Sequence, residues 1–285
     1  MSILKKIISF FLTVRKNSEA SLQINIHKEI RDLSNQNKYQ DPKNLVKFGY
    51  KVYSQSDEDG ILLEIFRRIG TSNKIFVEFG VGNGLENNTL FLLFQGWTGL
   101  WIDGSSKDVL SIKKHLSKFI ERGHLKLVNQ FIYKENINEI IDSQDISGEI
   151  DLLSIDIDGN DHHIFNEINQ INPRVVVMEY NAKFPPPLAC GMEYSARHVY
   201  SSNDCFGSSL AYQVDLMALK GFNLVGCNLS GINAFYVRKD LTKDLFVEPF
   251  SAENHYEPAR YHLSAQKSGH PSSFKTINNF QIKND

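Results

Sequence analysis

Short, almost entirely apolar segments alternate with amphipathic ones over residues 50–240, and this alternation constrains the fold more than any other feature of the chain. Strands that are apolar along their whole length are typical of a parallel sheet with helices on both faces. The pattern therefore predicts a doubly wound α/β sheet, with one helix over Lys107–Arg122. The expected strands are Lys74–Phe79, Gly99–Asp103, Leu125–Ile132, Ile150–Ile157 and Arg174–Tyr180.

The last part of this region departs from the alternation. A helix expected over Ser208–Lys220 is followed by Phe222–Leu229, by the turn residues Ser230 and Gly231, and by Ala234–Arg238. Two strands joined by so short a link form a hairpin. The sequence thus predicts a mostly parallel, doubly wound seven-stranded sheet that ends in an antiparallel hairpin. This Rossmann-like α/β arrangement is that of class I methyltransferases, whereas a nicotinamide-binding domain continues with parallel strands.

A glycine-rich loop, Glu78–Gly84, joins the first expected strand to the helix after it. Glycine lets the backbone turn sharply and approach a ligand without an intervening Cβ atom. Asp103 ends the next strand, where a carboxylate can accept the hydroxyls of a ribose. We expect S-adenosylmethionine (SAM) to bind here, with Glu78 near its amino-acid part directly or through water. The alternative is a dinucleotide site, but its Gly-x-Gly-x-x-Gly spacing differs from that of Gly80, Gly82 and Gly84.

Four segments resemble the FkbM-type SAM-dependent methyltransferases: Tyr53–Gly60, Glu78–Gly84, Gly96–Asp103 and Asn233–Arg238. The resemblance covers roughly residues 50–240, judged from the order of the motifs. Members of this family are mostly O-methyltransferases, and many are found with sugar, polysaccharide or polyketide pathways. The resemblance implies that Gln55 belongs to a segment that caps the cofactor and that Asp103 holds the ribose.

Acidic and amide side chains follow two neighbouring strands. Asp156 and Asp158 come at the end of the fourth expected strand, and Glu179 and Asn181 come at the end of the fifth. Because ligands of open α/β sheets bind at the carboxyl ends of strands, we expect these side chains to converge beside SAM. Converging carboxylates repel one another unless they are neutralised, and oxygen ligands suit Mg²⁺ or Mn²⁺. The alternative is a metal-free site in which Asp156 binds the cofactor or the substrate.

Two histidines, His162 and His163, directly follow this acidic stretch. A base must remove the proton of a hydroxyl group as it is methylated, and histidine suits that role near neutral pH. We expect one of the two to be this base, with Asp158 as a further catalytic residue. The alternative is that both histidines are packed or solvated at the start of a helix.

A long insert, Lys183–Gly207, follows the fifth expected strand. Loops longer than about 12 to 15 residues are usually functional or disordered. Aromatic, cationic and imidazole side chains in such a loop suit a polar, ring-shaped substrate. The expected substrate-binding residues are Tyr194, Arg197 and His198.

The balance of charged residues indicates which kinds of molecule the protein binds. The chain has 31 Lys and Arg residues against 33 Asp and Glu residues, so it lacks the basic excess of a typical nucleic-acid-binding protein. We therefore expect a small-molecule or glycan substrate and no nucleic acid. Three cysteines without metal-ligand spacing indicate a reducing compartment, which predicts a cytoplasmic protein.

The N-terminus contains an apolar run, Ile7–Val14, flanked by Lys5, Lys6, Arg15 and Lys16. This run is too short to span a bilayer, which needs about 20 apolar residues. It also lacks the small-residue cleavage site of a signal peptide. Two alternatives remain. Residues 1–16 form a helix on the inner surface of the membrane, or they pack on their own domain or on a partner.

We expect three regions: a helical lead-in over residues 1–45, a SAM-dependent methyltransferase domain over 46–240, and a tail or substrate lid over 241–285. Together with the resemblance, the site predicts methylation of a sugar hydroxyl, in a surface polysaccharide or a glycosylated metabolite. The alternatives are an amine, carboxylate or lipid-linked acceptor, and a non-catalytic domain with the same fold. The sequence predicts no oligomeric state.

Overall fold

The computed structural model describes residues 3–279; residues 1–2 and 280–285, which belong to the predicted lead-in and tail, lie outside the described part. Seven strands form one sheet: β1 (Ile75–Phe79), β2 (Thr98–Asp103), β3 (Leu125–Asn129), β4 (Gly148–Ile155), β5 (Ile171–Glu179), β6 (Phe222–Cys227) and β7 (Asn233–Arg238). Their order is β3-β2-β1-β4-β5-β7-β6, and only β7 runs antiparallel to its neighbours. The predicted fold class is confirmed.

Helices cover both faces of the sheet, as the apolar strands require. Successive residues of β1 show this, because Phe76 packs in the core of one face and Val77 in the core of the other. The first core also holds residues of α2 (Glu58–Ile69), α3 (Leu90–Phe94) and α4 (Ser106–His115). The second holds residues of α6 (Ile137–Asp142), α7 (Asp161–Glu167) and α8 (Leu210–Leu219). Both faces of the parallel strands are thereby shielded from water.

One predicted helix is divided in two, and one predicted strand ends earlier than expected. The helix over Lys107–Arg122 is divided into α4 and α5 (Ser117–Glu121), because the buried Leu116 between them has φ −107° and ψ 21°. The strand expected over Leu125–Ile132 stops at Asn129. Beyond that point Asn136 holds a turn, since its side chain accepts the Tyr133 N–H at 2.7 Å and donates to the Phe131 carbonyl at 2.9 Å.

A buried ion pair holds the amino-terminal edge of the sheet. The Asp151 carboxylate on β4 is fully buried and accepts a hydrogen bond from Arg174 Nη1 on β5 at 2.7 Å. It also accepts the backbone N–H groups of Ser72, Asn73 and Lys74 at 2.7 to 2.9 Å. Arg174 Nη2 donates to the Ile69 carbonyl at the end of α2. These contacts join two strands to the loop that enters β1.

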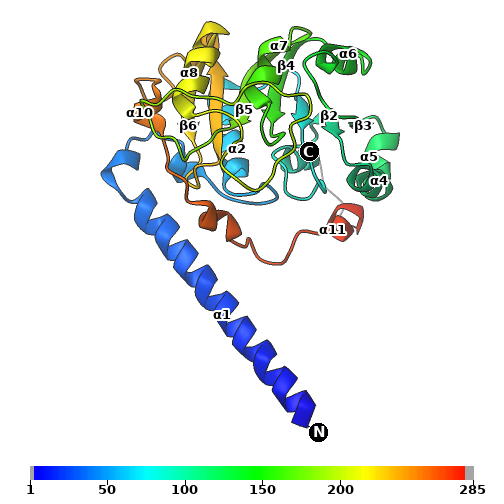
Figure 1. The fold of residues 1–285 in the computed structure, drawn as a ribbon, viewed down its shortest axis with the longest axis vertical. Helices are drawn as coiled ribbons and strands as arrows, with labels where there is room; N and C mark the ends of the chain where they lie inside the picture. The colour runs from blue at the N-terminus through cyan, green and yellow to red at the C-terminus, as the bar shows by residue number, and fades with distance from the viewer. Residues whose placement is uncertain (1–2, 280–285) are drawn as a thin grey trace.

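The lead-in contains one long helix, α1 (Ile3–Ser34). Its C-terminal half packs on η3 (Tyr261–Ala265), where Ile26 and Leu263 share a small core and Gln23 Nε2 donates to the Ala265 carbonyl at 2.9 Å. Its N-terminal half stands away from the domain (Figure 1), and the Ile7–Val14 run does not pack on it. Among the described residues, no helix has the length and apolarity needed to cross a membrane.

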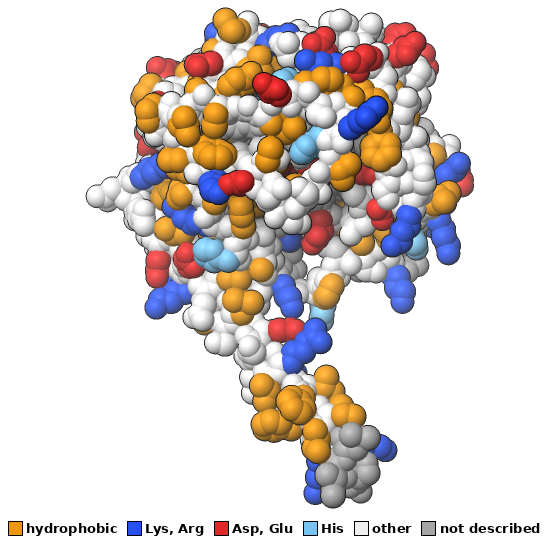
Figure 2. Space-filling model, in the orientation of Figure 1, with side chains coloured by type: hydrophobic (Ala, Val, Ile, Leu, Met, Phe, Trp, Pro, Cys, Tyr) orange, Lys and Arg blue, Asp and Glu red, His pale blue; other side chains and the backbone are white. Residues whose placement is uncertain are grey.

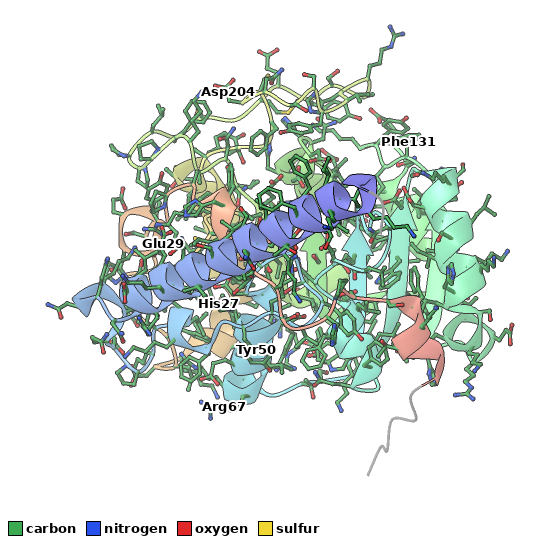
Figure 3. All side chains as sticks on the ribbon, turned by 90° about the horizontal axis from the view of Figure 1, so that it is seen from below. His27, Glu29, Tyr50, Arg67, Phe131 and Asp204 are labelled. Atoms are coloured by element: carbon green, nitrogen blue, oxygen red, sulfur yellow. The ribbon has the colours of Figure 1, made fainter. Side chains whose placement is uncertain are left out.

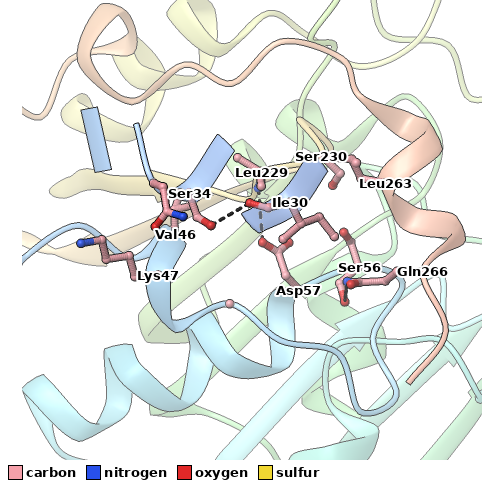
Figure 4. Close-up of a pocket in the computed structure, with 12 residues that line it drawn as sticks. Ile30, Ser34, Val46, Lys47, Ser56, Asp57, Leu229, Ser230, Leu263 and Gln266 are labelled. Atoms are coloured by element: carbon pink, nitrogen blue, oxygen red, sulfur yellow. Dashed lines mark hydrogen bonds between the residues drawn. The ribbon is translucent and has the colours of Figure 1, made fainter. Parts of the chain in front are cut away.

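A cavity of about 390 Å³ lies beneath the C-terminal half of α1 (Figure 4). Ile30 of α1, Leu263 of η3 and the Asp57 carboxylate line it. Burial and the neighbouring Glu58 raise the pKa of Asp57 to about 7, while the Leu229 N–H donates to its Oδ2 at 3.4 Å. No glycine of the Glu78–Gly84 loop is among its lining residues, so this cavity is distinct from the predicted cofactor site.

The C-terminal segment is tied to the lead-in through one buried carboxylate. Glu257 is 1% exposed and accepts hydrogen bonds from Lys38 Nζ, Tyr39 Oη and Arg260 Nη1 at 2.6 to 2.9 Å. The lead-in and the tail therefore support each other. The remaining short helices are η1 (Asn37–Tyr39), η2 (Val46–Phe48), α9 (Lys239–Thr242), α10 (Ala252–His255) and α11 (Phe274–Asn279).

Candidate functional site

A cavity of about 690 Å³ opens at the carboxyl ends of the first four strands. This is the edge at which open α/β sheets bind their ligands. Its walls come from the loops that follow β1, β2, β3 and β4 and from the long insert. The lining residues that carry polar or aromatic side chains are Asp103, Ser105, Gln130, Phe131, Tyr133, Asp156, Asp158, Asn160, Arg197, His198 and Tyr200.

The three loop glycines have different roles. Gly80 has φ +74°, and a Cβ atom there would lie 1.6 Å from the Asp156 carbonyl oxygen, so no other residue fits without moving the strand end. Gly82 lines the cavity and has open space where a side chain would point. Gly84 does not line the cavity, and a Cβ atom there would press on Ile112 and Trp101. The loop is therefore packed close at both ends and open in its middle.

Asp103 lies beside this loop at the end of β2. Its Oδ2 accepts the Gly82 N–H at 2.8 Å, and its Oδ1 accepts the Ser105 N–H at 2.7 Å. Both bonds fix the carboxylate at the cavity wall. A carboxylate oxygen has more than one acceptor position, so Asp103 can still accept hydroxyl groups from a bound ligand.

Glu78 and Gln55, both predicted to bind the cofactor, are not among the cavity-lining residues. The Glu78 carboxylate is 3% exposed and accepts hydrogen bonds from Asn87 Nδ2, the Asn88 N–H, and the N–H and hydroxyl of Thr89. Burial raises its pKa to about 7. Glu78 thus holds the turn before α3, because this turn presents several donors to the end of β1. The Gln55 side chain is exposed to solvent.

Three predicted metal ligands do converge. Asp156, Asp158 and Glu179 each present a carboxylate oxygen, and these oxygens lie within 4.8 Å of one another. Burial and the neighbouring carboxylates raise the pKa of Asp156 and of Glu179 well above the usual range. Burial also raises the pKa of Asp158. Such shifts are expected where like charges gather without a counter-ion.

Asp161 shapes the loop that carries two of these acids. It is 1% exposed, and its two oxygens accept the N–H groups of Ile157 and Gly159, both at 2.9 Å. Asp158 between them has φ +57°, a left-handed conformation that few non-glycine residues adopt. Asp161 therefore stabilises a strained backbone that turns the Asp158 side chain toward the cavity.

Asn181, the fourth predicted metal ligand, serves another purpose. Its Nδ2 donates to the Asp204 and Phe206 carbonyls at 2.9 and 3.1 Å, and its Oδ1 accepts the Lys183 N–H. It is 1% exposed and lies past the end of β5, so its amide anchors the long insert. Its Oδ1 is thus used in a hydrogen bond at the start of the insert.

Neither of the histidines predicted as the base lines the cavity. His162 is 2% exposed, its two ring nitrogens have no partner among the described residues, and burial lowers its pKa to about 4. The centres of the His162 and His163 rings lie 4.0 Å apart, and Nε2 of His163 forms a hydrogen bond with the Met192 carbonyl at 2.8 Å. Both histidines lie at the start of α7 and contact the insert. This agrees with the alternative to the role of base, in which both histidines pack at the start of a helix.

A different histidine, His198, lines the cavity. Its Nε2 lies 2.9 Å from the Asp158 carbonyl oxygen. Because a carbonyl only accepts, Nε2 must carry the proton, which leaves Nδ1 as a proton acceptor. The fit depends on Gly159, since a Cβ atom there would lie 2.5 Å from the ring. The sequence predicts His198 as a substrate-binding residue.

The other two predicted substrate residues, Arg197 and Tyr194, lie in different places. Arg197 lines the cavity, whereas Tyr194 does not. The Tyr194 hydroxyl donates to Glu135 Oε2 at 3.1 Å, and Lys134 Nζ lies 4.7 Å from the centre of its ring. Tyr194 therefore holds the insert against the loop after β3.

Two aromatic side chains that line the cavity, Phe131 and Tyr133, were not predicted from the sequence; they follow β3 in the chain. Phe131 was assigned to the expected strand Leu125–Ile132, and Tyr133 directly follows that strand. Phe131 is 64% exposed, and Figure 3 shows it on the other side of α1 from Tyr50 and Arg67. The available signal was two aromatic residues directly after the third strand, at the ligand-binding edge of the sheet.

No protein-family model matches the chain, and none of the curated proteins compared with it matches either. Solved structures do match. Magnesium protoporphyrin IX methyltransferase from Synechocystis PCC 6803 is 11% identical, with 65% of this chain and 83% of that chain covered and a TM-score of 0.44. The methyltransferase domain of bacterial CtHen1-C is 14% identical, with 65% and 97% covered and a TM-score of 0.41. The glycopeptide N-methyltransferase MtfA is 15% identical, with 64% and 87% covered and a TM-score of 0.36.

Proposed function

We propose that the protein is a SAM-dependent methyltransferase with its cofactor in the cavity at the carboxyl edge of the sheet. One observation carries the proposal: a glycine loop and Asp103 line a cavity in a sheet whose β7, between β5 and β6, runs antiparallel to both. A nicotinamide-binding sheet continues in parallel at that position. Gly82 is open toward the cavity, and Asp103 is fixed at its wall, so this set of groups fits a ribose and an extended chain.

Calorimetry with SAM tests this proposal. Asp103→Ala should weaken SAM binding by about 1.5 to 3 kcal/mol, because it removes charge-assisted hydrogen bonds. Asp108→Ala is the matched control, since Asp108 is a nearby carboxylate outside the cavity lining. The wild-type protein should bind SAM and its demethylated product at one site and should not bind NAD. Equal SAM affinity in Asp103→Ala, with an unchanged circular dichroism spectrum, would count against this site.

We further propose that the acceptor is a hydroxyl group of a sugar. The FkbM-type motifs suggest it, and other side chains that line the cavity support it. Phe131, Tyr133 and Tyr200 offer aromatic faces for the CH face of a sugar ring, and Arg197 offers hydrogen-bond donors. A pocket with apolar walls and a few polar groups is typical of a small-molecule site.

The carboxylates of Asp156, Asp158 and Glu179 fit a divalent cation such as Mg²⁺ or Mn²⁺. Their oxygens are hard ligands within 4.8 Å of one another, and no Lys or Arg forms an ion pair with them among the described residues. A bound cation would neutralise them and lower the pKa of a coordinated acceptor hydroxyl. We therefore propose that these three residues hold a cation, without Asn181.

His198 is the base that the cavity supports best. The acceptor oxygen forms a bond to the methyl carbon as the bond from that carbon to sulfur breaks, and the hydroxyl proton leaves. Nδ1 of His198 can take this proton, since its Nε2 is held by the Asp158 carbonyl. General bases of this kind typically contribute about 10²- to 10⁴-fold to the rate.

His198→Gln should therefore lower kcat by at least about a hundredfold with little change in SAM affinity. His163→Gln is the matched control and should change kcat only slightly, because its ring bonds the Met192 carbonyl outside the cavity. Both variants are compared by radiolabelled methyl transfer to a sugar acceptor. A large loss in His163→Gln and none in His198→Gln would return the role of base to the α7 histidines.

A further inference from the structure

The N-terminal half of α1 presents a set of large apolar side chains to solvent. Figure 2 shows them gathered on the part of the helix that projects from the domain. Phe10 and Phe11 are each 65% exposed, which is more than a folded domain normally leaves open at adjacent positions. The exposed apolar residues of this half are Ile7, Ile8, Phe10, Phe11, Leu12 and Val14.

Four of these six residues share one face of the helix. Ile7, Phe10, Phe11 and Val14 follow the spacing of one helix face, because they lie three, four and seven residues apart. Lys5, Ser9 and Lys16 fall on the opposite face by the same spacing, together with Leu12. The segment is also cationic: its charged residues are Lys5, Lys6, Arg15 and Lys16, and the first acidic residue of α1 is Glu19.

The apolar face ends after about two turns. The next positions on the same face are the polar residues Ser18, Ser21 and Asn25, with Leu22 as the one apolar residue among them. A coiled coil with a second copy of the chain needs an apolar seam sustained over several heptads. The short face does not provide such a seam. It does match a helix that lies in the surface of a bilayer, where only a short apolar stripe enters the lipid.

We propose that the N-terminal half of α1 is a membrane-surface anchor that binds bilayers containing anionic lipids. The apolar face inserts among the acyl chains, and Lys6 and Lys16 bind the lipid phosphates. Each basic residue near an anionic surface contributes about fivefold to binding. This proposal is independent of the methyltransferase proposal, because it depends only on α1.

The test is co-sedimentation of the full-length protein with vesicles of phosphatidylcholine alone or mixed with phosphatidylglycerol. We expect binding to the mixed vesicles and at least about tenfold weaker binding to the neutral ones. The double variant Phe10→Ser, Phe11→Ser should lower binding to the mixed vesicles by at least about tenfold. Its matched control, Leu110→Ser with Leu219→Ser, removes two leucines that are 66% and 87% exposed on α4 and α8 and should bind as wild type.

A second pair of variants tests the charges. Lys6→Gln with Lys16→Gln should weaken binding to mixed vesicles by about 25-fold, while Lys113→Gln with Lys114→Gln on α4 should not. Sedimentation equilibrium of the protein without vesicles tests the alternative, in which a second copy of the chain covers the apolar face. A dimer that Phe10→Ser, Phe11→Ser disrupts, together with no vesicle binding, would overturn the proposal in favour of a second copy. Equal binding by the wild type and the phenylalanine variant would overturn it as well.

Discussion

Removal of divalent cations with EDTA is expected to abolish methyl transfer, and Mg²⁺ or Mn²⁺ is expected to restore it. The reason is the convergence of Asp156, Asp158 and Glu179, whose oxygens lie within 4.8 Å of one another at the proposed acceptor position. Without a cation these carboxylates repel one another and cannot lower the pKa of an acceptor hydroxyl. A Lewis acid at such a position contributes several kcal/mol, so the rate should fall by at least about a thousandfold.

Substitution of the ligands should reproduce this loss. Asp156→Asn and Glu179→Gln keep the shape of the side chain but remove its charge, so activity should fall while SAM affinity stays close to that of the wild type. Glu139→Gln on α6 is the matched control, because Glu139 is exposed and does not line the cavity. Full activity in EDTA, after the absence of metal is verified by elemental analysis, would mean that the acids act without a cation.

Asp151→Ala is expected to lower the free energy of unfolding by about 3 to 5 kcal/mol, the cost of leaving one partner of a buried pair unpaired. Arg174, only 7% exposed, would keep its charge but lose the carboxylate that forms its ion pair. The N–H groups of Ser72, Asn73 and Lys74 would also lose their acceptor. Urea unfolding followed by circular dichroism measures the change.

The matched control for this prediction is Asp240→Ala. Asp240 also pairs with an arginine, Arg238, at 2.7 Å, but its side chain is 60% exposed. Exposed pairs of this kind contribute less than about 1 kcal/mol. A loss in Asp151→Ala no larger than that in Asp240→Ala would show that the amino-terminal edge of the sheet does not depend on this pair.

The sheet could be predicted from the sequence because its strands are nearly continuous apolar runs. The short link at Ser230 and Gly231 also predicted the hairpin that distinguishes this sheet from a nicotinamide-binding one. The ends of elements could not be predicted as well. Leu116 has the apolar character of a helix interior, and only its backbone angles show that the helix stops there. Ile132 is apolar like a strand residue, although β3 ends at Asn129.

The site was predictable where the fold alone decides the position of a side chain. Asp103, Asp156 and Glu179 follow directly from strand ends, and they lie at the cavity or in the cluster of acids beside it. Side chains on loops and at helix starts were not predictable. His162 points away from the cavity because of how α7 begins. His198 reaches it through a long loop whose path depends on Gly159, Asn181 and other distant contacts.

The continuity of α1 has a kinetic consequence. Between Ile3 and Ser34 the helix contains neither glycine nor proline, so it is a stiff rod of about 48 Å without a hinge. If the proposed anchor holds its apolar half at a bilayer, the rest of the chain would travel with that surface and search two dimensions rather than three. Encounters with an acceptor anchored in the same bilayer then become more frequent without any change in the cavity, because the effective concentration of that acceptor rises.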